Sequence, residues 1–107
     1  MLVETVEAVK QAGGNPMSLT LYGQEQNLTT AGIARMNLYL HGVEGFEIKR
    51  GDSFREPKLI DPEGGLRKFD VVIANPPLSL QNWGADGRAK DPYKRALGGI
   101  VPPAKNG

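Results

Sequence analysis

The sequence predicts an α/β fold in which about three parallel strands alternate with two helices. Helical and strand-like segments follow one another along residues 1–77, and this alternation is typical of strands that pair in parallel through crossovers. The last predicted strand, residues 69–74, contains four consecutive small or β-branched apolar residues, as in a strand buried on both faces. Residues 78–107, which are rich in glycine, proline and charge, form a loop-rich segment after this core.

The first helix and the first strand are predicted from hydrophobic spacing. Residues 1–12 have the spacing of an amphipathic helix, which ends at Gly13–Pro16. No capping side chain precedes Met1, so we expect the natural element to extend further back. Residues 17–22 alternate in part and are predicted to form a short strand, which is followed by polar residues as far as Asn27.

The second helix is predicted over residues 30–41, with Asn27 or Thr29 as its cap and Gly42 as its end. A short strand follows at residues 46–49, and a loop over residues 55–68 leads to the strand at 69–74. The buried stripe of the helix is expected to consist of Ile33, Met36 and Leu40, with Ala34 and Leu38 beside them.

Composition limits the possible classes of protein. At 107 residues the chain is one domain at most, and fourteen glycines and eight prolines indicate much loop. A net charge of +1 neither requires nor excludes nucleic acid. The absence of cysteine excludes disulfides and thiolate metal sites, and a single histidine, His41, argues against a histidine-rich metal centre. No apolar run is long enough for a membrane span and no signal peptide is evident, so we expect a cytoplasmic protein.

Three polar residues follow the three predicted strands: Glu25, Asp52 and Asn75. Parallel strands have their carboxyl ends at one edge of the sheet, where α/β proteins bind ligands. An acidic residue at such a position typically accepts hydrogen bonds from ribose hydroxyls, and Asp52 can similarly accept from an adenine amine. The Asn75 amide oxygen and the Pro76 carbonyl can together hold an amino group. Taken singly, each of these residues is also explained by an ordinary turn, and only their joint placement points to a ligand site.

Four segments of the chain carry a family resemblance: Leu21-Tyr22-Gly23-Gln24-Glu25, Ala34-Arg35-Met36-Asn37-Leu38-Tyr39-Leu40-His41-Gly42, Gly51-Asp52-Ser53-Phe54 and Phe69-Asp70-Val71-Val72-Ile73-Ala74-Asn75-Pro76-Pro77. In order and spacing they resemble the modification (M) subunit of type I restriction–modification systems, which are S-adenosylmethionine-dependent DNA adenine-N6 methyltransferases. Asn82-Trp83-Gly84 and residues 91–106 extend this resemblance over nearly the whole chain.

The resemblance implies a role for each motif. Glu25 matches the residue that binds the cofactor ribose, and Asp52, with Ser53, matches the position near the cofactor adenine. The catalytic motif is Asn75-Pro76-Pro77, which would hold the amine of a flipped adenine during direct methyl transfer, without a metal. Leu78 stands where the family has an aromatic residue that stacks on the base. DNA and the specificity and restriction subunits are the implied partners.

The resemblance also implies that this is a partial methyltransferase domain. The family's glycine-rich cofactor loop would lie before Met1, and the later strands would lie after Gly107. We therefore expect the isolated chain to be inactive, to bind S-adenosylmethionine poorly if at all, and to expose strand edges through which it can self-associate. Two alternatives stay open: an Asn-Pro-Pro methyltransferase acting on glutamine or RNA, and a non-catalytic association module.

Overall fold

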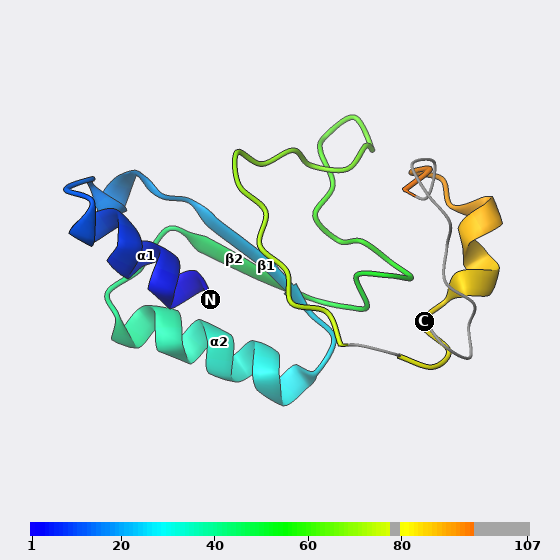
Figure 1. Cartoon of the computed structure of the whole chain (residues 1–107), viewed down its shortest axis with the longest axis horizontal. Helices are drawn as coiled ribbons and strands as arrows, with labels where there is room; N and C mark the ends of the chain where they lie inside the picture. The colour runs from blue at the N-terminus through cyan, green and yellow to red at the C-terminus, as the bar shows by residue number, and fades with distance from the viewer. Residues whose placement is uncertain (78–79, 96–107) are drawn as a thin grey trace. The chain divides into compact units, whose positions relative to one another are not determined.

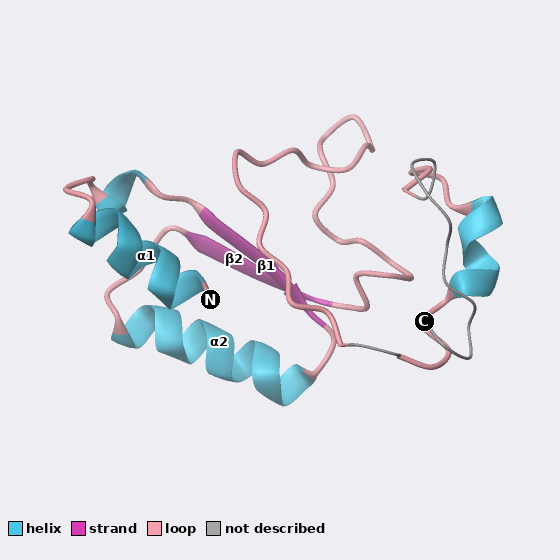
Figure 2. Ribbon diagram, viewed as in Figure 1, coloured by secondary structure: helices cyan, strands magenta, loops and turns pink. Residues whose placement is uncertain are grey.

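The computed structural model describes residues 1–77 and 80–95, and the chain divides into two compact units, Met1–Ser53 and Phe54–Gly107. The first unit contains the two α-helices and the two strands that are labelled in Figures 1 and 2. In chain order its elements are helix α1 (Leu2–Gln11), the 3₁₀ turn η1 (Pro16–Ser18), strand β1 (Leu21–Glu25), helix α2 (Leu28–Leu40) and strand β2 (Phe46–Arg50). The α/β class, the two helices and the parallel pairing are as predicted.

Strands β1 and β2 form a two-stranded parallel sheet whose register runs from Leu21↔Phe46 to Glu25↔Arg50. Backbone hydrogen bonds extend the ladder at both ends. The Leu21 N–H donates to the Gly45 carbonyl at 2.8 Å, and the Gly51 N–H donates to the Glu25 carbonyl at 3.0 Å. The register is therefore fixed over the full length of both strands.

Strand β1 begins at Leu21, so the prediction of a strand from residue 17 was wrong. Residues Pro16–Ser18 instead form η1, because proline occupies its first position and Asn15 caps it. The Asn15 side chain accepts a hydrogen bond from the Met17 N–H at 3.0 Å. Strand β1 therefore starts four residues later than predicted, and it ends at Glu25.

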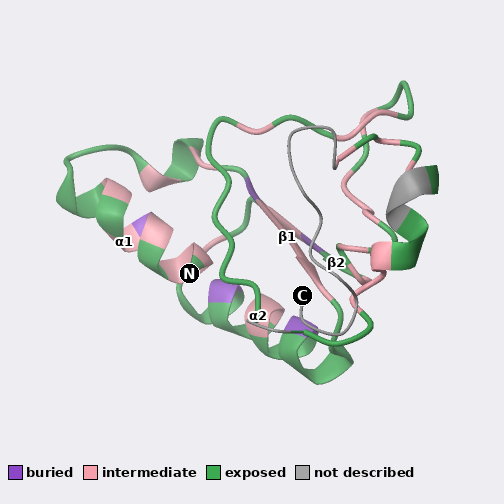
Figure 3. Ribbon diagram, turned by 45° about the vertical axis from the view of Figure 1, so that its right-hand side comes forward, coloured by how far each residue is buried: buried purple, intermediate pink, exposed green. Residues whose placement is uncertain are grey.

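The core of the first unit consists of five buried residues, coloured purple in Figure 3, and both helices contribute to it. Leu21 and Ile48 lie on the same face of the sheet, because their register partners, Phe46 and Gly23, occupy matching positions. A Cβ built on Gly23 would lie 2.8 Å from Ile48 Cδ1 and 3.6 Å from Leu2 Cδ1. Both helices therefore cover one face of the sheet. The five residues are Val6, Leu21, Ala31, Leu38 and Ile48.

Helix α2 buries Leu38, as predicted, but the predicted stripe of Ile33, Met36 and Leu40 faces away from the sheet. Its cap is Asn27, one of the two candidates predicted, and the Asn27 Oδ1 accepts a hydrogen bond from the Thr30 N–H at 3.0 Å. Ala31 and Leu38 are buried, with Arg35 half-buried between them. The Arg35 guanidinium donates to the Ile48 carbonyl at 2.6 Å. Because the face of α2 that contains Ala31, Arg35 and Leu38 is directed to the sheet, Ile33, Met36 and Leu40 lie on the opposite face. They are 55%, 60% and 75% exposed.

The prediction of a third strand at residues 69–74, buried on both faces, was wrong for the structure described here. These residues are not part of a strand, and Val71, Val72 and Ile73 are 74%, 76% and 50% exposed. An apolar segment becomes a buried strand only where neighbouring strands and covering layers exist. The described part of the second unit supplies only an isolated antiparallel bridge, Ile60↔Leu66.

The rest of the described second unit consists of turns. Around Asp61, whose Oδ1 accepts from the Gly65 N–H at 2.7 Å, the predicted loop over residues 55–68 closes into a tight bend. A 3₁₀ segment, η2 (Ala85–Lys90), lies where the sequence predicted no helix. Over the described ranges 1–77 and 80–95, no helix is both long and apolar enough to cross a membrane.

We expect Leu38→Ala to destabilise the first unit by about 2–5 kcal/mol, because it empties a fully buried site in a five-residue core. Leu40→Ala is the matched control on the same helix, and its effect is expected to stay within about 0.5 kcal/mol. Urea unfolding followed by circular dichroism measures both. Equal losses for the two variants would contradict the orientation of α2.

Candidate functional site

The carboxyl edge of the parallel sheet carries two of the predicted site residues. Glu25 is the last residue of β1, and Asp52 lies two residues beyond the end of β2. The hydrogen bond from the Gly51 N–H to the Glu25 carbonyl joins the two strand ends directly before Asp52. Both side chains are half-buried. The sheet therefore brings the two carboxylates to one edge, at the usual ligand position of α/β proteins.

The Glu25 carboxylate is held by the chain that enters α2. Its Oε1 accepts a hydrogen bond from the Asn27 N–H at 2.8 Å, one residue before the helix begins. Within the described part of the chain, Oε2 has no hydrogen bond of its own. One oxygen thus fixes the orientation, and the other can accept from a ligand hydroxyl.

The remaining predicted residues lie further along the chain. Ser53 is the exposed last residue of the first unit, directly after Asp52. Asn75, Pro76 and Pro77 belong to the second unit, where they are exposed and outside any helix or strand. Leu78 lies outside the described residues. That Asn75 meets Glu25 and Asp52 at one crevice stays a prediction.

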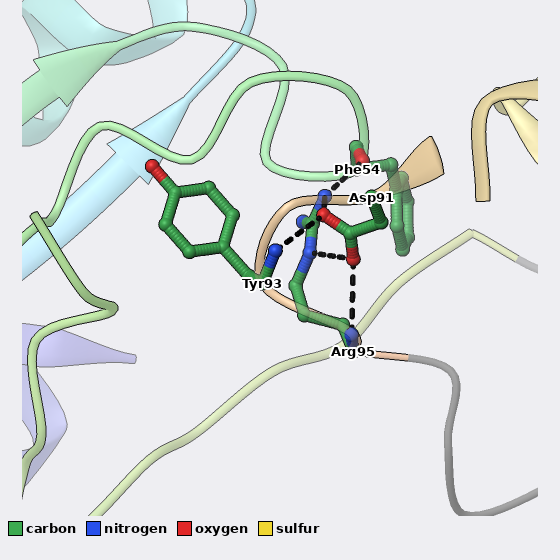
Figure 4. Close-up of polar contacts among 4 residues, drawn as sticks. All are labelled: Phe54, Asp91, Tyr93 and Arg95. Carbon is green, nitrogen blue, oxygen red and sulfur yellow. Dashed lines mark hydrogen bonds and ion pairs between the residues drawn. The ribbon is translucent and has the colours of Figure 1, made fainter. Parts of the chain in front are cut away.

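A second polar cluster, which the sequence did not single out, joins Asp91 and Arg95 (Figure 4). Arg95 Nε donates to Asp91 Oδ2 at 2.8 Å and Arg95 Nη2 donates to Oδ1 at 3.1 Å. The backbone N–H of Arg95 reaches the same carboxylate at 3.0 Å, and that of Tyr93 at 3.3 Å. Arg95 Nη2 also donates to the Phe54 carbonyl at 3.0 Å, which ties the start of the second unit to residue 95. The four-residue spacing of opposite charges was the available signal.

These hydrogen bonds determine the charge state of Asp91. Asp91, with only 2% of its side chain exposed, is ionised by its surroundings: hydrogen bonding from Arg95 lowers its pKa to about 2. The guanidinium of Arg95 donates hydrogen bonds to the Asp91 carboxylate and to the Phe54 carbonyl. These bonds indicate a structural role for Arg95 rather than contact with DNA phosphates. Charges of both signs line the neighbouring hollow of about 250 Å³. These charges are Arg55, Asp86, Lys90, Asp91 and Arg95.

Trp83 packs inside the same unit. Its ring meets that of Phe54 edge to face, with ring centres 5.9 Å apart and an interplanar angle of 71°. Trp83 is therefore a packing residue of the second unit.

The chain belongs to the N-6 DNA methylase family, whose model matches residues 1–107. This family match assigns the chain to the methyltransferases, the class that the sequence motifs predicted.

Individual relatives within this family are methylase subunits of type I restriction enzymes. The chain is 37% identical to the type I restriction enzyme MjaVII methylase subunit of Methanocaldococcus jannaschii, over 99% of this chain and 18% of the relative. It is 34% identical to the HindI methylase subunit of Haemophilus influenzae, over 84% and 19%, respectively. The MpnII methylase subunit of Mycoplasma pneumoniae is 30% identical, over 94% and 20%. The predicted resemblance to type I modification subunits is confirmed, and the chain spans about a fifth of the length of these relatives.

The Asp91–Arg95 pair makes the second unit sensitive to acid. Because the folded-state pKa of Asp91 is about 2 and its ordinary value is 3.8, the ion pair stabilises the unit fully above about pH 4. The contribution is lost as the pH falls towards 2. We expect the Asp91 carboxyl carbon to titrate near pH 2 by NMR, and Arg95→Gln to return its pKa towards the ordinary value. Titration near pH 4 in the unmodified chain would contradict the geometry of this pair.

Proposed function

We propose that this chain is part of the catalytic domain of a DNA adenine-N6 methyltransferase, the modification subunit of a type I restriction–modification system. The observation that carries the proposal is the parallel sheet of a family member with Glu25 and Asp52 at one edge. In the whole domain the fold would be Rossmann-like, and residues 69–74 would act as a further strand. DNA and the specificity and restriction subunits are its proposed partners.

Glu25 and Asp52 are proposed to bind the cofactor. S-adenosylmethionine, when bound, supplies a methyl group activated by a sulfonium centre. Glu25, oriented by the Asn27 N–H, accepts hydrogen bonds from the ribose hydroxyls. Asp52 and Ser53 lie on the neighbouring strand end and contact the adenine. The carboxylates also favour binding of the positively charged sulfonium cofactor over a neutral analogue.

Asn75 and Pro76 are proposed to hold the target amine. The Asn75 side-chain oxygen and the Pro76 carbonyl accept the two N–H bonds of an adenine that has left the duplex stack. The amine nitrogen then directs its lone pair at the methyl carbon. Pro76 and Pro77 fix two φ angles, so the motif loses little freedom on binding. The acceleration would come from positioning and charge complementarity. Leu78 would add apolar contact to the base without the stacking of an aromatic ring.

Asn75→Ala is expected to reduce methyl transfer by at least about 100-fold, because the amine loses its principal acceptor. The assay uses a chimera of the MjaVII methylase subunit in which this chain replaces the matched segment, with radiolabelled S-adenosylmethionine and duplex DNA. Asn37→Ala, on the exposed face of α2, serves as the control. A folded chimera that binds the cofactor and methylates equally well with Ala at position 75 would contradict the assignment.

Glu25→Gln is expected to weaken S-adenosylmethionine binding by the same chimera about 10- to 150-fold, because neutral hydrogen bonds replace charge-assisted ones. Calorimetric titration measures the dissociation constant. Glu44→Gln, an exposed residue before β2, should leave it unchanged. The proposed ribose contact is refuted if both variants bind the cofactor with equal affinity.

A further inference from the structure

Asn27 forms hydrogen bonds to both sides of the junction between strand β1 and helix α2. On the helix side, its Oδ1 accepts from the Thr30 N–H at 3.0 Å and its carbonyl accepts from the Ala31 N–H at 2.9 Å. These two bonds belong to the start of the helix. On the strand side, the Asn27 N–H donates to Glu25 Oε1 at 2.8 Å. One residue therefore connects the first turn of α2 with the carboxylate at the end of β1.

The helix fixes the direction of the Asn27 N–H. Asn27 is exposed, so its place is not set by packing. Ala31, which donates to its carbonyl, is fully buried in the core of the first unit, and the cap bond to Thr30 holds the Asn27 side chain against the first turn. The N–H therefore keeps one direction for as long as the first turn of α2 is formed.

Glu25 is consequently held at both ends. Its carbonyl accepts from the Gly51 N–H at 3.0 Å, and its carboxylate accepts from the Asn27 N–H. A long side chain that has to be ordered when a ligand binds reduces the affinity by about 2- to 12-fold. A glutamate that is already ordered avoids this loss.

We propose that Asn27 is a positioning residue of the cofactor site, whose N–H holds the Glu25 carboxylate in the orientation that receives the cofactor ribose. The capping bond of the same residue fixes that N–H, so the start of α2 and the site form together. This inference rests on the proposed role of Glu25 as a cofactor contact. It adds a residue that acts on the cofactor only through Glu25.

Two substitutions separate the capping side chain of Asn27 from its N–H. Asn27→Ala and Asn27→Pro both remove the side chain that caps α2, but only proline also removes the N–H. Proline can adopt the backbone conformation of this position, because the φ angle of Asn27 is −76°. The difference between the two variants therefore measures the bond to Glu25.

Calorimetric titration of the MjaVII chimera with S-adenosylmethionine gives the first test. We expect Asn27→Pro to bind the cofactor about 5-fold more weakly than Asn27→Ala, and the two variants to bind equally in the Glu25→Ala background. A role confined to helix folding would give the same ratio in both backgrounds, and that result, or equal affinities with Glu25 present, would overturn the proposal. If Glu25→Ala alone leaves the affinity unchanged, the proposed cofactor contact itself fails.

NMR of the full chain gives a second test, which needs no cofactor. Three-bond couplings within the Glu25 side chain report its rotamer populations. We expect one dominant rotamer in the unmodified chain and in Asn27→Ala, and averaged couplings in Asn27→Pro. Asn15→Ala is the control and should leave Glu25 unchanged, since Asn15 caps η1 through a similar bond, from the Met17 N–H to its Oδ1 at 3.0 Å.

Averaged couplings in the unmodified chain, or a single Glu25 rotamer in Asn27→Pro, would overturn the proposal. Circular dichroism shows whether each variant retains α2. If Asn27→Pro loses the helix, an ester in place of the backbone amide of residue 27 removes the same N–H and keeps the capping side chain. The same titration and the same couplings then decide the outcome.

Discussion

The parallel pairing of β1 with β2 is the constraint on which the rest of the first unit depends. Parallel strands cannot be joined by a hairpin, so the chain must return along the sheet before β2 begins. Helix α2 makes this return: thirteen residues span about 20 Å, close to the length of a five-residue strand. Both strands consequently end at the same edge, and Glu25 and Asp52 follow them there. The candidate cofactor site is a consequence of this connection.

The same pairing explains why a charged residue lies on the inner face of α2. In the ladder, the Gly45 carbonyl and the Gly51 N–H point towards β1. Because successive residues of a strand alternate their backbone groups, the Ile48 carbonyl points to the opposite edge of β2. Arg35 donates to that carbonyl from the helix above. It thereby satisfies a group on an open strand edge, which otherwise favours pairing with another chain.

The sequence was informative wherever local chemistry determined structure. Asn27 was predicted as a cap because its side chain satisfies a helix N–H, and glycine and proline marked the end of the first helix. For α2, the spacing of apolar residues predicted the burial of Leu38 but not the exposure of Ile33, Met36 and Leu40, because the face that packs on the sheet contains Arg35 and the opposite face is more apolar. The run at Val71–Ile73 was predicted as a strand, but burial depends on neighbours that a local pattern does not contain. Asp91 and Arg95 form a bidentate pair that depends on a turn, which their spacing alone did not determine.

The β1–β2 register brings the ends of both strands, and with them Glu25 and Asp52, to one edge of the sheet. Through-hydrogen-bond NMR couplings in the ¹⁵N,¹³C-labelled chain test it most directly. The account predicts a coupling between the Gly51 amide nitrogen and the Glu25 carbonyl carbon, since that bond closes the ladder at 3.0 Å. A coupling between the Gly51 amide nitrogen and any other carbonyl carbon would show that the strands pair in a different register. In that register Glu25 and Asp52 would not lie beside each other. That result would contradict the proposed cofactor site, because the site requires Glu25 and Asp52 to lie at the same edge of the sheet.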